Sequence, residues 1–186
     1  MGNRFAISDH HFAHDNIYRF KDSEGNLIRP WADSAQEADE MMIDAWNSVV
    51  NDKDIVYNLG DVSISRRGLK LLPRLKGRVR LAGGNHDIFK LADYLPYFED
   101  IKGSYKVGRM IMNHYPIHPE SIPRWCLANV HGHIHQNTVM RENARGERVP
   151  DRRYFNLSIE AVGLAPLAVE EIEARIQKAQ EAYPDE

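Results

Sequence analysis

The sequence predicts a single α/β domain spanning residues 1–186. Three observations lead to this expectation. The length suits one domain with a full hydrophobic core. Apolar runs of strand length are interspersed with segments of helical periodicity, in mixed order. No internal repeat, low-complexity tract or linker divides the chain, and its 42% hydrophobic and 27% charged residues are typical of a soluble protein.

The first elements follow from local pattern. Residues 4–8, "RFAIS", predict a short strand that runs into the polar stretch "DHHFAHDN". Residues 33–50 predict an amphipathic helix, with Ser34 and Glu37 forming a capping-box start. The helix is indicated by apolar residues that recur every three or four positions: Ala35, Ala38, Met42, Ala45 and Val49. The nearby Met41 and Trp46 are expected in the core.

The remaining elements alternate strands with two helices. Strands are predicted at 54–61, 78–87, 109–116, 127–135 and 152–160. A short helix at 65–75 is limited by Pro73, and a closing helix at 165–183 has Pro166 near its start. The closing helix has an apolar stripe formed by Val169, Ile172, Ile176, Ala179 and Tyr183. The polar segment 136–153 predicts a solvated hairpin or loop, with its position over a site left open.

Composition limits the cellular setting and the partners. The net charge is −3 and the pI about 6.3, so bulk charge gives no strong signal for nucleic-acid binding. Cys126 is the single cysteine, which excludes an intramolecular disulfide, indicates a reducing, cytoplasmic setting and suggests a small core residue. No apolar run approaches the length of a membrane span. The oligomeric state is not indicated.

Five apolar runs end in residues of the types that bind metals. These endings are Asp9-His10-His11, Gly60-Asp61, Gly84-Asn85-His86-Asp87, Asn113-His114 and His131-Gly132-His133-Ile134-His135. Ligands of α/β sheets bind just beyond the carboxyl ends of the strands. If the strands share a sheet, we expect these side chains to converge on one site.

The ligand types indicate the chemistry of that site. Carboxylates and neutral imidazoles suit borderline divalent ions, and an asparagine carbonyl adds a weak neutral ligand. The absence of clustered cysteines argues against a structural zinc site of the finger type. One carboxylate can bridge two ions, and two ions about 3.5–4 Å apart serve in-line displacement at phosphorus. The sequence therefore predicts a two-metal site for phosphoester hydrolysis.

The order D-x-H, G-D, G-N-H-D, H and G-H-x-H, spread over residues 9–135, resembles the calcineurin-like metallophosphoesterases. "SDHHFAHDN" and "HYPIH" resemble its small bacterial and phage-type single-domain branch. The resemblance implies two mixed β-sheets packed face to face with flanking helices. It also implies seven metal ligands: Asp9, His11, Asp61, Asn85, His114, His133 and His135. Asp61 would bridge the ions, with Asp9, His11 and His135 on the first and the other three on the second.

Two further roles are implied at the same motifs. His86 would face the scissile phosphate as general acid or transition-state stabiliser, and Asp87 would orient His86. One departure limits the function. Where the family often has G-D-x-x-D, this chain reads "GDVSI", with Ile64 at the second acidic position, which disfavours a protein phosphatase.

The resulting hypothesis is hydrolysis of a small phosphate ester, including nucleotides, by attack of a metal-bound hydroxide. A phosphodiesterase is favoured; a phosphomonoesterase and a non-catalytic metal-binding scaffold are the alternatives. The cofactors would be two divalent ions, manganese first, with iron, zinc, cobalt or nickel as alternatives. His10 is not expected to be a ligand, and His131 is expected to be buried and hydrogen-bonded. The roles of His14, His118, Arg66 and Arg67 stay open.

Overall fold

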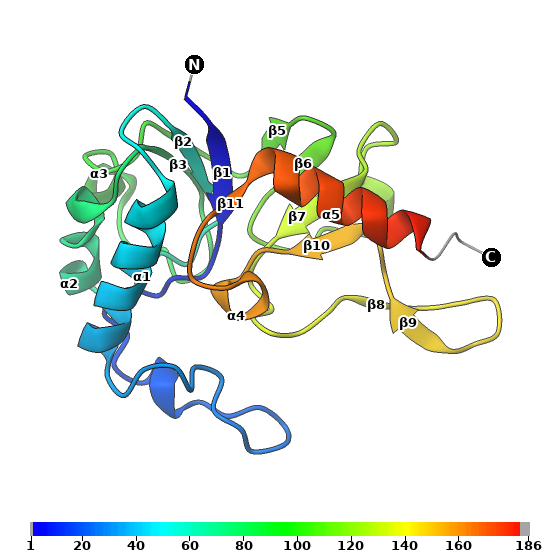
Figure 1. Ribbon diagram of the computed structural model, residues 1–186, viewed down its shortest axis with the longest axis horizontal. Coiled ribbons are helices and arrows are strands. Elements are labelled where there is room, and N and C mark those ends of the chain that lie inside the picture. The colour runs from blue at the N-terminus through cyan, green and yellow to red at the C-terminus, as the bar shows by residue number, and fades with distance from the viewer. Residues whose placement is uncertain (1, 183–186) are drawn as a thin grey trace.

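The computed structural model describes residues 2–182 and has an α/β fold with two mixed sheets and flanking helices (Figure 1). The first sheet has the order β11-β1-β2-β3-β4, in which β1 to β4 run parallel and β11 pairs antiparallel with β1. Its strands are β1 Arg4–Ile7, β2 Ile55–Asn58, β3 Arg78–Ala82, β4 Asp100–Lys102 and β11 Leu167–Ala168. The predicted strands at 4–8, 54–61 and 78–87 are thus confirmed.

The second sheet has the order β10-β7-β6-β5. Its strands β10, β7 and β6 run parallel, and β5 pairs antiparallel with β6. They are β5 Tyr105–Val107, β6 Met110–Met112, β7 Ala128–His131 and β10 Tyr154–Asn156. The expectation of two mixed sheets is therefore correct, and the parallel strands send their carboxyl ends toward common edges.

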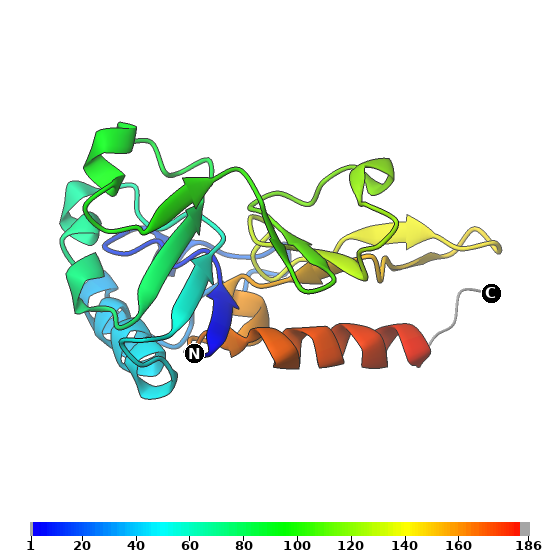
Figure 2. The ribbon, with the colours of Figure 1, turned by 90° about the horizontal axis from the view of Figure 1, so that it is seen from above.

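Alternation along the first sheet divides the core in two. Phe5 and Ile7 of β1 face the cluster that contains α1 (Ala35–Val49), whereas Ala6 between them faces the second sheet. Figure 2 shows the two sheets side by side, with α5 (Val169–Glu181) running along the second one. Ile172 and Ile176 of α5 are buried in that second cluster. The sheets therefore pack against each other with helices outside.

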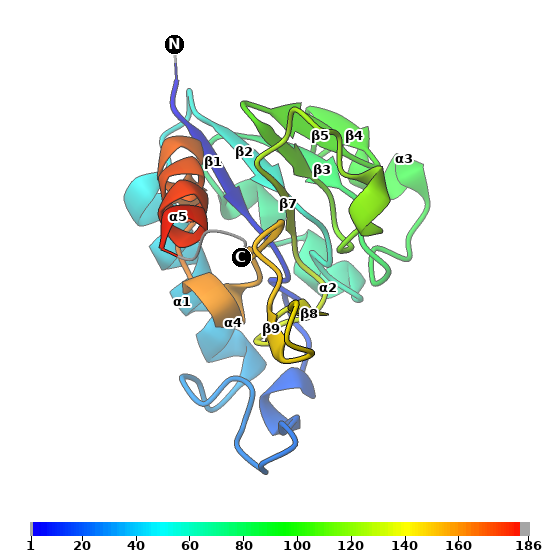
Figure 3. The same ribbon diagram turned by 90° about the vertical axis from the view of Figure 1, so that its right-hand side faces the viewer.

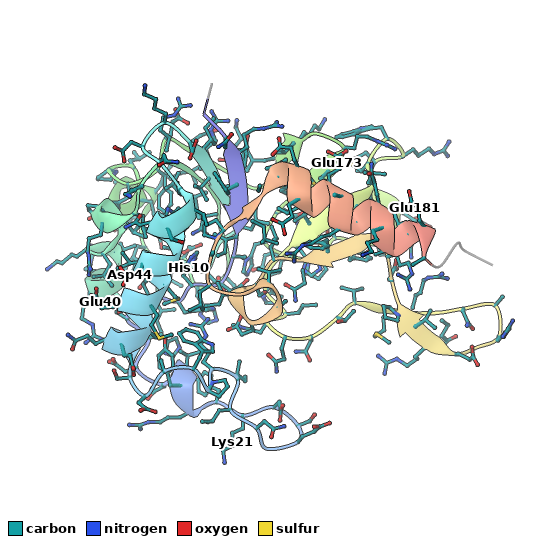
Figure 4. All side chains as sticks on the ribbon, in the orientation of Figure 1. His10, Lys21, Glu40, Asp44, Glu173 and Glu181 are labelled. Atoms are coloured by element: carbon teal, nitrogen blue, oxygen red, sulfur yellow. The ribbon has the colours of Figure 1, made fainter. Side chains whose placement is uncertain are left out.

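Helix α1 begins where the sequence predicts. The Ser34 hydroxyl accepts a hydrogen bond from the backbone N–H of Glu37 at 3.2 Å, and the Glu37 carboxylate accepts from Asp33 N–H at 2.9 Å. Figure 4 shows Glu40 and Asp44 on the outward face of the helix. Its inward face carries fully buried Trp46.

Short helices and 3₁₀ turns complete the fold. They are the helices α2 Arg66–Leu69, α3 Leu91–Tyr94 and α4 Ile159–Val162, and the 3₁₀ turns η1 Ile17–Arg19, η2 Leu72–Arg74 and η3 Pro119–Ser121. The predicted helix at 65–75 is thus split into α2 and η2. The predicted strand at 152–160 ends at Asn156, because the chain turns there into α4.

The end of the chain corrects a second prediction. Leu167–Ala168, expected inside the closing helix, instead pair with β1, so α5 begins at Val169. Ala179 is exposed and does not belong to the apolar stripe. Tyr183 lies outside the described residues. The polar segment 136–153 does form a hairpin, β8 Met140–Glu142 with β9 Arg148–Pro150. It projects away from the sheets in Figures 1 and 2, and in Figure 3 it points toward the viewer.

Candidate metal centre

The backbone is strained where the strands of the two sheets end. Among the described residues, six other than glycine have a positive φ: Asp9, His11, Ala13, Asp61, His133 and His135. Five of these are predicted metal ligands. Such backbone angles are uncommon for residues with a Cβ, and they cluster at functional sites where the surrounding structure holds them. The strain therefore marks the same positions that the motifs mark.

The first of two metal-site-like clusters, the first triad, contains Asp9, His11 and His135. One ligand atom from each lies within 4.8 Å of the others. The Asp9 carboxylate is fully buried and accepts hydrogen bonds from Ser158 Oγ at 2.9 Å and from the backbone N–H of His133 at about 3.0 Å. The rings of His11 and His135 stack with centroids 5.3 Å apart.

The second triad contains Asp61, His114 and His133, whose ligand atoms also lie within 4.8 Å of one another. The Nδ1 of His114 lies 2.8 Å from the carbonyl oxygen of Leu59, which turns Nε2 toward the triad. Asn85 contributes its side-chain oxygen 3.0 Å from that Nε2. The structure thus brings all three residues predicted for the second ion beside Asp61.

Asp61 lies between the triads. Its Oδ2 is 3.6 Å from Nε2 of His11, and its Oδ1 is 3.4 Å from Nε2 of His114. One carboxylate therefore presents a different oxygen to each triad. Burial raises the pKa of Asp61, and the negative charge of Asp9 adds to this effect. A cation between the triads would favour the ionised form of both groups.

Ring nitrogens of the triads are buried without hydrogen-bond partners among the described residues, which fits a site for metal ions. His11 is only 2% exposed, yet neither of its ring nitrogens has a hydrogen-bond partner among the described residues. Nδ1 of His133 is likewise unpartnered and buried. Unsatisfied buried polar atoms are rare and call for an explanation such as an ion. Burial, followed by the charge of Arg29, lowers the pKa of His11 well below its ordinary value, which keeps the imidazole in its ligating form.

Two glycines bring the backbone against the carboxylates. A Cβ on Gly132 would lie 2.2 Å from Oδ2 of Asp9, and one on Gly84 would lie 2.2 Å from Oδ1 of Asp61. No residue with a side chain fits either position without displacing a triad carboxylate. The glycines of the G-N-H-D and G-H-x-H motifs are thus required for close approach to the triads.

The loop of Asn85, His86 and Asp87 exposes His86 and is held by the Asp87 carboxylate. His86 is exposed, and its ring lies 5.3 Å from that of His11. The Asp87 carboxylate accepts three backbone hydrogen bonds, from Asp61, Val62 and Gly84, at 2.8 to 3.0 Å. Within residues 2–182 it has no hydrogen bond to the His86 ring, and its orientation of His86 stays a prediction. Asp87 ties the His86 loop to the loop of Asp61.

The sequence reasoning missed a buried ion pair behind the first triad. Glu160, whose side chain is 1% exposed, accepts from Arg29 Nε at 2.8 Å and lies 2.9 Å from Nδ1 of His135. Arg29 is fully buried and also donates to the backbone carbonyls of Asp9 and His10 at 2.6 and 2.8 Å. Burial opposes protonation of His135, but the hydrogen bond and charge of Glu160 outweigh it and raise the pKa of His135.

Comparison with known proteins places the chain in a family. No protein-family model matches it. The uncharacterized protein MJ1445 of Methanocaldococcus jannaschii is 30% identical over 184 residues, covering 94% of this chain and 91% of that protein. The chain belongs to the MJ1445 family.

Solved structures add a fold likeness. The protein of unknown function AQ665 from Aquifex aeolicus matches with a TM-score of 0.66 at 24% identity, covering 94% of this chain and all of that one. It shows that the two-sheet fold of this MJ1445-family chain occurs elsewhere. A novel archaeal phosphodiesterase matches with a TM-score of only 0.45 at 16% identity, covering 84% of this chain and 82% of that one, which does not establish a shared fold.

The other histidines of this MJ1445-family chain lie outside the triads. His10 is fully buried against Phe12 and Trp46, and burial lowers its pKa to about 3 (Figure 4). His131 is buried with Nδ1 2.8 Å from the carbonyl oxygen of Gly132, as expected. His14 lies beside His11 with ring centroids 5.9 Å apart. His118 accepts from Glu120 N–H at the start of η3.

The remaining open residues have structural partners. Arg66 pairs with Asp93 at 2.9 Å, and Arg67 pairs with Asp15 at 2.6 Å. Cys126 is half-buried at a cavity of about 530 Å³ and is not the core residue predicted. None of the described residues lining that cavity is a predicted site residue. No helix within residues 2–182 is long and apolar enough to cross a membrane.

Proposed function

We propose that this chain is a two-metal phosphoesterase of the calcineurin-like type, acting as a phosphodiesterase on small or nucleotide substrates. The observation that carries the proposal is the placement of Asp61, which offers one carboxylate oxygen to each of two triads. Two divalent ions held there would supply charge neutralisation for the phosphate and a water of lowered pKa. Manganese suits the mixed carboxylate and imidazole ligands, as do iron, zinc, cobalt and nickel.

The residues around the triads divide the remaining work. Asp9, His11 and His135 would hold the first ion; Asn85, His114 and His133 would hold the second, with Asp61 shared. His86 is exposed, and its ring lies 5.3 Å from the His11 ring. It can therefore reach a phosphate and hold a proton near the leaving oxygen. Asp87 fixes the backbone of its loop through Gly84 and Asp61. Water reaches the open side, where Asn85 and His86 lie exposed.

The test is hydrolysis of bis(4-nitrophenyl) phosphate beside 4-nitrophenyl phosphate. The protein is stripped with a chelator and then supplied with Mn²⁺, Zn²⁺, Mg²⁺ or no metal. We expect metal-dependent turnover, faster on the diester, which falls on the order of 10²-fold or more in His86→Ala. His118→Asn is the matched control, because Asn can still accept the Glu120 N–H that His118 accepts.

The result distinguishes the alternatives. Faster turnover of the monoester would replace the phosphodiesterase by a phosphomonoesterase of the same site. Two bound ions per chain without turnover of either ester would support a metal-binding scaffold. A chain that binds no metal under any condition would contradict the proposal altogether.

A further inference from the structure

Two exposed aromatic side chains lie near the triads, one directly beside the second triad and one separated from the first by His14. The ring of Tyr115 is 44% exposed and lies 4.7 Å from the ring of His133 and 4.8 Å from that of His114. Phe20 is 48% exposed and lies 5.8 Å from His14, which itself packs beside His11 of the first triad. Large exposed aromatic rings at the edge of a polar site are candidates for ligand contact.

Tyr115 is held in place by buried polar groups. Asn113 Nδ2 donates to the backbone carbonyl of Tyr115 at 2.6 Å, and Asn129 Nδ2 donates to Asn113 Oδ1 at 2.6 Å. Both asparagines are buried, and Pro116 restricts the backbone of the tyrosine that precedes it. The ring therefore stands against the second triad without first having to be ordered, which favours binding on its free face.

The exposure of Tyr115 indicates that the fold does not require an aromatic ring at this position. Nearly half of the side chain is open to water, and within residues 2–182 its hydroxyl has no hydrogen-bond partner. Its ring contacts are to two histidines of the second triad, His114 and His133. A flat apolar face beside a site for phosphate suits a ligand that carries a phosphate and a planar ring.

We propose that this site takes phosphate esters bearing a nucleobase, and that Tyr115 determines this specificity by stacking on the base. The inference rests on the proposed function for the phosphate position. Phe20 lies beside His14, which packs next to His11 of the first triad, and there it would contact a second planar group of a larger ester such as a dinucleotide. Stacking of a base on an aromatic side chain strengthens binding by roughly five- to 100-fold.

The experiment compares two ligands that share a sugar phosphate and differ only in the base. Isothermal titration calorimetry gives the Kd of adenosine 5′-monophosphate and of ribose 5-phosphate for the metal-loaded full chain, its Tyr115→Ala variant and its Tyr115→Phe variant. We expect the unaltered chain to bind adenosine 5′-monophosphate about tenfold more tightly. Tyr115→Ala should reduce that preference to about twofold or less, and Tyr115→Phe should keep it because the ring is retained.

Several outcomes would overturn the inference. Equal binding of the two ligands by the unaltered chain would do so, as would binding of neither. An equal loss for both ligands in Tyr115→Ala would show a structural role only. Hydrolysis of bis(4-nitrophenyl) phosphate, measured in parallel, separates the two proposals. Turnover without a base preference removes the specificity inference alone, whereas a Tyr115-dependent base preference without turnover removes the proposed reaction alone.

Discussion

The two triads differ in the groups that support their histidines. Behind the first, a fully buried arginine and a buried glutamate support one of its histidines: Arg29 pairs with Glu160, and Glu160 lies 2.9 Å from Nδ1 of His135. Behind the second, a neutral carbonyl performs the same task, because Leu59 O lies 2.8 Å from Nδ1 of His114. Both arrangements fix the tautomer and direction of an imidazole.

The electrostatic consequences are opposite. Glu160 raises the pKa of His135 against the effect of burial, whereas burial lowers the pKa of His114. The second triad also borders exposed Asn85 and Tyr115, while Arg29 closes the first from behind. The first triad is therefore supported by a buried ion pair, and the second by a neutral backbone carbonyl. Two triads of similar residues can therefore differ in their affinity for an ion, because the groups that support them differ.

The largest expected effect comes from removing a side chain of the first triad. His11→Ala deletes an imidazole whose two ring nitrogens are both buried without a hydrogen-bond partner among residues 2–182. We expect the first ion to be lost and turnover to fall on the order of 10³-fold, since a catalytic ion contributes several kcal/mol to the barrier. Metal content by mass spectrometry and kcat for bis(4-nitrophenyl) phosphate measure the two effects. If His11→Ala kept both ions and full turnover, the first triad would not be a metal site.

A milder change tests the supporting charge itself. Glu160→Gln keeps an oxygen near His135 but removes the carboxylate, so we expect affinity at the first position to fall about 10- to 100-fold. The second position should change far less, because its imidazole depends on a backbone carbonyl. Stepwise chelator titration followed by metal analysis separates the two positions. Glu170→Gln, which removes an exposed partner of Arg4, is the matched control. An equal loss at both positions would refute the contrast.

The residues of the two triads could be selected from the sequence because they follow closely after apolar strands. Asp9, Asp61 and Asn85 come within three residues of the ends of β1, β2 and β3, and parallel pairing brings those ends together. Arg29 and Glu160 gave no such signal. Arg29 stands in a polar loop, its partner is 131 positions away, and only the folded chain shows that both are buried.

The errors in the fold have the same origin. Leu167–Ala168 were assigned to a helix because local pattern continues into α5, but pairing with β1 across the chain makes them a strand. Strands β4 and β5 have three residues each, too few for a period to be recognised. The three backbone hydrogen bonds of the Asp87 carboxylate could likewise not be predicted from sequence, and its orienting role toward His86 stays a prediction. Tertiary pairing decides each of these cases.

The smallest effect concerns the loops that follow the ligands. On the first side, the carboxylate of Asp39 accepts from the backbone N–H of Ala13 at 2.9 Å, two residues after His11. On the second, neutral Asn129 and Asn113 brace the loop after His114. Burial raises the pKa of Asp39 to about 6, so only the first side should respond to pH near neutrality.

The sign of that response follows from proton binding. An unfolded aspartate loses its proton near pH 4, whereas folded Asp39 keeps it to about pH 6. Its contribution to stability is therefore complete below pH 4 and is lost as the pH rises through 6, by up to about 3 kcal/mol. In urea unfolding of the metal-free chain, we expect Asp39→Asn to gain free energy of unfolding relative to the unaltered chain between pH 4 and 7. Exposed Asp52→Asn should show no such gain. Parallel profiles for Asp39→Asn and the unaltered chain would mean that Asp39 is ionised at no cost, and that the two sides do not differ in their supporting loops.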